Sequence, residues 1–132
     1  MEQKNSEEIW RVELNQGGSD IVNWVKMPIE HSEEFYEANV SCCYAFEHVE
    51  PYVYFHGGYD DNKIKGNFIA SIDLRMEPLV TKKVAPTADF PKGRSKHSLT
   101  AIGNKLYMFG GSDGEAVLDE FWEFDTIKED WS

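Results

Sequence analysis

Basic residues are scarce in this chain of 132 residues, which has 13 Lys and Arg against 24 Asp and Glu and a formal net charge of −11. Nucleic acids and anionic membranes are bound through a basic footprint, so neither is expected as a partner. Long-range electrostatic steering would instead favour a basic protein partner. The chain also lacks any apolar run near the ~18 residues of a membrane helix. Its polar start, MEQKNSEEIW, has no apolar core of a signal peptide.

Cysteine is almost absent, because the only two residues of this type are the neighbours Cys42 and Cys43. Neighbours on a strand point to opposite faces, so this pair makes a poor disulfide and at most half a metal site. Such usage is typical of a reduced compartment and predicts a cytoplasmic or nuclear location. The histidines lack zinc-ligand spacing, and the carboxylates do not follow a calcium-binding loop. We therefore expect no metal and no cofactor.

Aromatic residues are plentiful, at 14% of the chain, and they favour strands. The chain also repeats itself. The segment "CCYAFEHVEPYVYFHGGYDD" (42–61) aligns without a gap with "SKHSLTAIGNKLYMFGGSDG" (95–114), at an offset of 53 residues (110 − 57). A third, partial copy is indicated at the N-terminus, where "RVEL" (11–14) resembles "SIDL" (71–74). A period near fifty predicts an array of similar structural units.

Each copy has the pattern of four short strands separated by turn residues. The first strands are "NVSCCYAFEHV" and "SKHSLTAI", and the second are "YVYFH" and "KLYMF", each ended by Gly-Gly. The third are "FIASIDL" and "EFWEFDT", and the fourth are "EPLVTKKV" and "DWS". The continuous apolar character of the second strands predicts burial on both faces. The segment 31–38 is the only helical candidate, and we expect an inter-repeat loop there.

These features resemble the kelch repeat. The resemblance is carried by Gly110-Gly111 after "KLYMF", by "FWEFD", by Trp131, and by Arg94-x-x-His97 ahead of them in the chain. Two consecutive glycines at a strand end permit positive φ and a close approach of neighbouring backbone, which wedge-shaped blades require. The middle copy departs from the pattern, with Ser41 and Tyr44 at the positions of Arg94 and His97.

The resemblance implies an all-β fold, namely a partial kelch-type β-propeller of four-stranded antiparallel blades. It implies a half blade at 8–27, a full blade at 39–84 and a nearly complete blade at 94–132. Propellers close with at least about four blades, so the remaining blades are expected from the rest of a longer chain or from other subunits. The structural motif residues implied are Gly57, Gly58, Gly110, Gly111, Tyr54, Tyr107, Trp122 and Trp131.

One motif points to a different class of protein. Residues 110–114 spell G-x-S-x-G, the pattern that places a nucleophilic serine in serine hydrolases. That arrangement needs a strand-to-helix turn and a histidine later in the chain, and no histidine follows Ser112. Tyr59 takes the serine's place in the middle copy. We therefore interpret Ser112 as a turn residue.

The function expected from this resemblance is a non-catalytic module that binds proteins through loops on one face of the propeller, as an adaptor or scaffold. Two alternatives stay open: a structural subunit of a larger assembly, and a segment of a kelch-propeller enzyme. The loops implied are 28–38, 59–67, 85–96 and 112–119. The candidate partner-binding residues are Asp60, Asp61, Lys63, Lys65, Arg94, Asp113 and Glu115.

Overall fold

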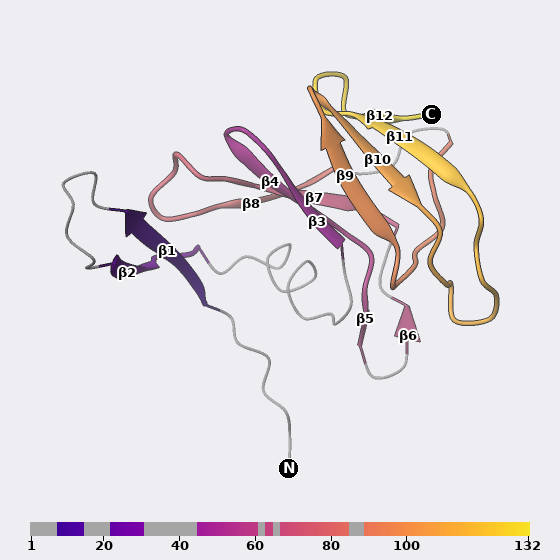
Figure 1. Cartoon of the computed structure of the whole chain (residues 1–132), viewed down its shortest axis with the longest axis horizontal. Helices are drawn as coiled ribbons and strands as arrows, with labels where there is room; N and C mark the ends of the chain where they lie inside the picture. Colours follow the sequence, from indigo (N-terminus) through magenta and orange to yellow (C-terminus); the bar gives the residue numbers. More distant parts are fainter. Residues whose placement is uncertain (1–7, 15–21, 31–44, 61–62, 65–66, 85–88) are drawn as a thin grey trace, which may run out of the picture.

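The computed structural model describes residues 8–14, 22–30, 45–60, 63–64, 67–84 and 89–132 (Figure 1). Over these residues the chain is built from strands and loops, with no helix long and apolar enough to span a membrane. The strands are β1 (Ile9–Leu14), β2 (Val22–Met27), β3 (Ala45–Val49), β4 (Tyr52–His56), β5 (Tyr59–Asp60), β6 (Lys63–Ile64), β7 (Ile69–Asp73), β8 (Thr81–Val84), β9 (Ser98–Ile102), β10 (Lys105–Phe109), β11 (Phe121–Asp125) and β12 (Asp130–Trp131).

Two four-stranded antiparallel sheets form the body of the molecule. Strands β3, β4, β7 and β8 form the middle blade, and β9 to β12 form the last blade. In both blades each strand pairs with the next one along the chain, except that the short β5–β6 hairpin is inserted between β4 and β7. The predicted all-β class with four-stranded antiparallel blades is confirmed. The helical candidate at 31–38, and the predicted start of the middle blade at residue 39, lie outside the described residues.

The N-terminal strands β1 and β2 form an antiparallel hairpin that packs on one face of the middle blade. Met27 of β2 is buried against Ile72 of β7 and Leu79. The segment after β2 continues this contact, because the Leu79 amide donates to the Pro28 carbonyl at 2.8 Å. The hairpin, the middle blade and the last blade therefore follow one another in space as they do in sequence.

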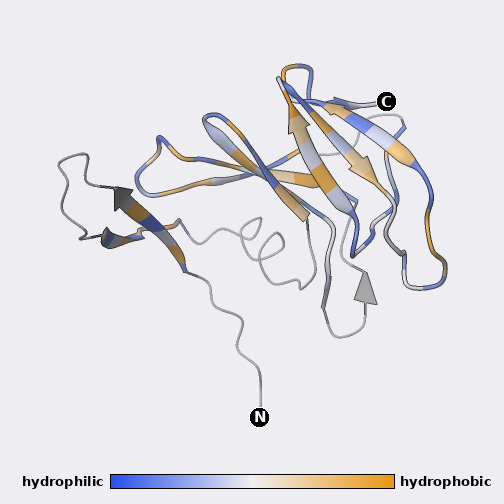
Figure 2. Cartoon of the chain, viewed as in Figure 1, coloured by the Kyte–Doolittle hydropathy of each residue, from blue (hydrophilic) through white to orange (hydrophobic). Residues whose placement is uncertain are grey.

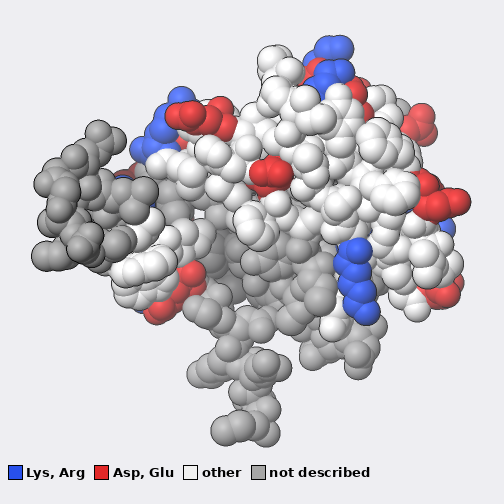
Figure 3. Space-filling model, viewed as in Figure 1, with Lys and Arg blue, Asp and Glu red and all other residues white. Residues whose placement is uncertain are grey.

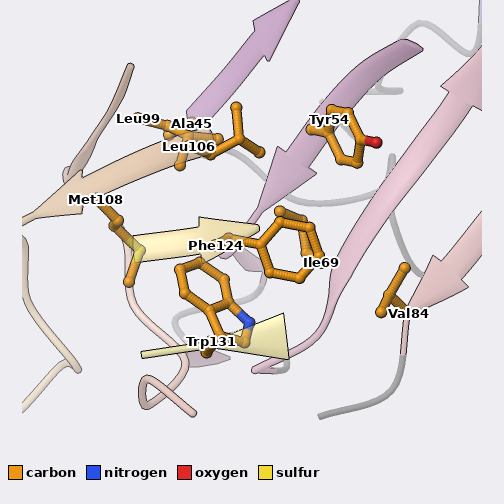
Figure 4. Packing of buried hydrophobic residues seen from close by; sticks show 9 residues of the cluster. All are labelled: Ala45, Tyr54, Ile69, Val84, Leu99, Leu106, Met108, Phe124 and Trp131. Carbon is orange, nitrogen blue, oxygen red and sulfur yellow. The ribbon is translucent and has the colours of Figure 1, made fainter. Parts of the chain in front are cut away.

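The main core lies between the two blades, where side chains from both sheets meet (Figure 4). Phe124 of β11 is fully buried, and its ring lies 6.2 Å from that of Tyr54 and 5.0 Å from that of Trp131. Leu106, directly opposite Phe124 in the sheet register, is also fully buried. Phe124 of the third strand and Trp131 of the fourth strand thus fill the space between the two blades.

The prediction that the second strands are buried on both faces is wrong for β10. Leu106 and Met108 are fully buried, whereas Phe109, which points to the opposite face, is 54% exposed. Burial also alternates at the start of β9, where the buried Leu99 lies between the exposed Ser98 and Thr100. Figure 2 shows that this strand has both hydrophobic and hydrophilic residues. The reason is that the middle blade covers only one face of the last blade.

Apolar side chains lie on the two outermost sheet faces. On the last blade, Ile102, Phe109 and Phe121 are 54–66% exposed, and Phe121 stacks on Tyr107 with 5.7 Å between ring centroids. On the hairpin, Trp24 is 66% exposed. That further blades cover these faces stays a prediction.

Candidate protein-binding loops

Three loops at one end of the sheets are joined by backbone hydrogen bonds. The Gly58 amide, after β4, donates to the Arg94 carbonyl at 2.8 Å. Ser95 and Ser112 exchange two hydrogen bonds, of 2.9 and 3.0 Å, which tie the segment before β9 to the loop after β10. We call the residues 57–60, 89–97 and 110–120 together the loop face; the β5–β6 hairpin and the loop after β10 project from the same end of the molecule (Figure 1).

The two glycine doublets shape the loop face. Gly57 and Gly110 have φ angles of 73° and 70°, and Gly58 and Gly111 have 94° and 93°, so the repeated doublets share one backbone conformation. A Cβ atom on Gly57 would lie 2.1 Å from the Arg94 carbonyl oxygen. On Gly111 it would lie 2.6 Å from the Ser95 carbonyl oxygen. Glycine is therefore required by close approach as well as by conformation.

Arg94 is the largest fully buried side chain among the described residues, although we predicted from the sequence that it is one of the partner-binding charges. Its guanidinium donates to the carbonyls of Lys92 and Gly110, both at 3.1 Å, and to Glu120 Oε2 at 2.6 Å. A planar guanidinium suits this role because its donors diverge in fixed directions. The prediction that Arg94 presents its charge to a partner is therefore wrong. The buried Arg94 side chain instead holds the loops together through its hydrogen bonds.

The carboxylate of Glu120 completes this arrangement. The hydrogen bond from Arg94, together with one from Trp122 Nε1 at 3.1 Å, lowers the pKa of Glu120 below its usual range. Trp122 in turn lies edge-on to Trp131, with 6.4 Å between ring centroids. Two motif tryptophans are therefore linked to the loop face through one carboxylate.

Asp113 organises the tip of the loop after β10. Its Oδ1 accepts hydrogen bonds from the amides of Ala116 (2.8 Å) and Glu115 (3.0 Å), which lower the pKa of Asp113. Ser112 Oγ accepts from the Gly114 amide at 3.2 Å, so Ser112 takes part in the turn. This aspartate is only partly exposed, and its first role is to hold the loop in one conformation.

We expect Asp113→Ala to loosen this tip without unfolding the blades. The amides of Glu115 and Ala116 would lose a charged acceptor, and should exchange with solvent about tenfold faster. The pKa of Asp113 is lowered in the folded protein. Its carboxylate therefore stabilises the loop tip fully above the ordinary carboxyl pKa, and this stabilisation is lost as the pH falls through the pKa of Asp113 in the folded protein. Hydrogen exchange followed by NMR measures this effect, with Asp119→Ala as the control; equal exchange in both variants would contradict it.

The exposed part of the loop face includes an apolar side chain that sequence analysis missed. Val117 is 89% exposed, and Glu115 and Asp119, two residues away on either side, are exposed as well. Lys92 lies nearby, with its Nζ 3.7 Å from Asp113 Oδ2. Acidic and basic side chains are interspersed on the face shown in Figure 3. A single valine in a polar loop carries no sequence signal that would distinguish it.

The other predicted binding residues are placed only in part. Asp60 and Lys63 lie opposite each other in the β5–β6 hairpin. Asp61 and Lys65 lie outside the described residues. Within the described ranges, no group of three or more His, Cys, Asp and Glu side chains could hold a metal ion.

The repeated four-stranded sheets, the equivalent glycine doublets and the core between blades define a repeat protein of the β-propeller class. A family profile described as "KLHDC2/KLHL20/DRC7 Kelch-repeats domain" matches residues 3–132. The chain belongs to the kelch-repeat family.

Known relatives match parts of the chain. Kelch-like protein 25 of Xenopus tropicalis is 44% identical over 52 residues, which is 39% of this chain and 9% of that protein. The N-(sulfonatooxy)prop-2-enimidothioate sulfolyase of Thlaspi arvense is 40% identical over 53 residues, 39% of this chain and 15% of that enzyme. Putative protein tag-53 of Caenorhabditis elegans is 31% identical over 87 residues, 60% of this chain and 6% of that protein. The matched segments are small fractions of these relatives' lengths.

Proposed function

We propose that this chain is a non-catalytic protein-binding module, an adaptor or scaffold, and that it binds its partner through the loop face. Kelch repeats are generally protein-interaction modules, and the exposed Val117 between two carboxylates carries the proposal for this chain. An apolar contact ringed by charged groups is the usual composition of a protein interface. The hydrogen bonds that join the loops support the same function, because a surface that is already ordered loses little conformational entropy on binding.

The state of the carboxylates favours binding over proton transfer. Hydrogen bonds lower the pKa values of Asp113 and Glu120, so both are ionised at neutral pH. A general acid needs a pKa raised toward the working pH. These two groups are hydrogen-bond acceptors that hold loops, and they are poorly suited to donating protons.

The partner surface is proposed to be basic. The net charge of −11 attracts a positively charged protein at long range. Glu115 and Asp119 would meet its basic side chains, while Val117 would contact an apolar one. Raising the salt concentration should then slow association more than it speeds dissociation.

The test compares two double variants of the full-length protein. Val117→Ser with Glu115→Lys alters the loop face, and Ile127→Ser with Glu77→Lys makes the same change of charge away from it, in the turn between β11 and β12 and in the loop between β7 and β8. The controls are well matched, because Val117 is 89% and Ile127 77% exposed. Partners are first identified by native affinity purification, and affinities are then measured with the purified partner.

We expect the loop-face variant to bind at least about tenfold more weakly, the usual loss when an anchor residue is removed from an interface. The control should bind like the wild type. Thermal unfolding of both variants checks that neither substitution disturbs the blades. Equal binding by both variants, or a loss confined to the control, would show that the partner uses another surface.

A further inference from the structure

Two histidines from different blades meet in the seam between the sheets. His56, the last residue of β4, is 1% exposed, and its Nδ1 lies 3.2 Å from Nε2 of His97, just before β9. The two rings are edge-on, with 5.0 Å between centroids, and His56 also lies edge-on to Trp131 at 5.5 Å. This imidazole pair is therefore a direct contact between the middle blade and the last blade.

The surroundings of the pair leave little room for rearrangement. A Cβ atom on Gly57 would lie 2.7 Å from His97 Cε1, and one on Gly111 would lie 2.9 Å from His97 Cβ. The His97 side chain is thus held close to both glycine doublets, with its ring beside Gly57 and its Cβ beside Gly111. The outer ring nitrogens, His56 Nε2 and His97 Nδ1, are buried without a hydrogen-bond partner among the residues that the structure describes.

The charged group that acts on both rings is Arg94, and it disfavours their protonation. Its own counter-ion is Glu120, which precedes β11 and pairs with the guanidinium. Trp131 of β12 contacts the His56 ring. Its neighbour Asp130 lies on the opposite face of the same sheet, because successive residues of a strand alternate between faces. Lys96, beside His97 in the chain, is exposed.

A single hydrogen bond between two neutral imidazoles uses one proton, donated by one ring and accepted by the other. Two imidazolium rings would both be donors and would repel each other. Burial is the main cause that lowers the pKa of His56 to about 3 and that of His97 to about 4, and Arg94 adds to both shifts. The closed seam therefore holds both rings neutral.

The repeat shows that neither position needs histidine for packing. At the offset of 53 residues, His56 falls on Phe109, and His97 falls on Tyr44. The neighbouring copy thus has an aromatic residue that does not ionise near neutral pH at each position. Histidine keeps a planar aromatic ring at each position and adds a group that can gain a proton as the pH falls below neutral.

We propose that the His56–His97 pair is an acid-sensitive latch between the two blades, which loosens the seam and the attached loops as the pH falls. The sign follows from linkage. The pKa values of both histidines are lowered in the closed seam, so their contribution to closure is complete above the ordinary value of 6.5 and is lost as the pH falls toward the closed-state values. The latch goes beyond the proposed function, and it is tested without a binding partner.

The expected effect is large over a narrow pH range. If an opened seam restores the ordinary pKa, the ratio of open to closed seam rises about 20-fold per histidine between pH 7 and pH 5. The amide of Gly58 reports opening directly, because its hydrogen bond to the Arg94 carbonyl joins the loop after β4 to the segment before β9. The protection factor of this amide, corrected for the intrinsic pH dependence of exchange, should fall by more than about tenfold over that range.

The decisive comparison uses the full-length protein and His56→Phe, which places the residue of the neighbouring copy in the seam. The variant should lose about half of the pH dependence, measured on a logarithmic scale, while remaining folded at pH 7. His48→Phe, at an exposed site on β3, is the control and should behave like the wild type. Protection factors that fall equally in wild type and His56→Phe would overturn the proposal.

A second measurement covers the case in which His56→Phe fails to fold. NMR titration of the wild-type imidazole nitrogens should show both rings of the pair neutral at pH 5.5, with a shared proton between His56 Nδ1 and His97 Nε2. An imidazolium signal from either ring at that pH in the folded protein would also overturn the proposal.

Discussion

Replacing Gly57 by alanine should lower the free energy of unfolding by about 3–5 kcal/mol, because left-handed strain and overpacking add at this position. The residue has a φ of 73°, and a Cβ atom would lie 2.1 Å from the Arg94 carbonyl oxygen. That oxygen also accepts a hydrogen bond from the Gly58 amide. It therefore cannot move away from a new Cβ atom without breaking a hydrogen bond between the loops. The change should be measured by denaturant unfolding at pH 7.

Gly103→Ala separates the two causes. Gly103 has a similar φ of 62°, but a Cβ atom there would meet nothing within 4 Å. Only the conformational cost remains, about 1–2 kcal/mol. If both variants lost the same stability, the close approach at Gly57 would not be what requires glycine there.

Arg94→Met should lower the free energy of unfolding by about 2–4 kcal/mol, since the Lys92 and Gly110 carbonyls lose their donor and Glu120 loses its buried counter-ion. Methionine retains an unbranched apolar stem, so the loss reports the guanidinium more than the packing. Arg94→Lys should rescue little, because an ammonium cannot reach the Lys92 and Gly110 carbonyls and Glu120 from one position. Thermal and denaturant unfolding measure both variants.

Arg75→Met is the matched control. Arg75 also pairs with a carboxylate, donating hydrogen bonds to both oxygens of Asp73 at 2.9 and 2.7 Å, but its side chain is 64% exposed. Exposed ion pairs add little to stability, so this variant should unfold almost like the wild type. A loss as large as that of Arg94→Met would mean that burial is not what makes Arg94 important.

The sequence alone determined the class of fold and its repeating unit. Tyr54 and Tyr107 fall at the same place in equivalent strands, and both glycine doublets follow those strands with the same backbone conformation. Local residue types determine such features, because strand patterns end where glycine permits positive φ.

Only the tertiary structure decided what these residues contact. An arginine in a polar loop gave no sign that it would be fully buried beneath the loop face, and Val117 gave no sign that it would be its most exposed apolar residue. His56 and His97 meet only because two blades pack face to face. Burial and pairing of this kind depend on which sheet covers which face, and that is a property of residues far apart in the chain.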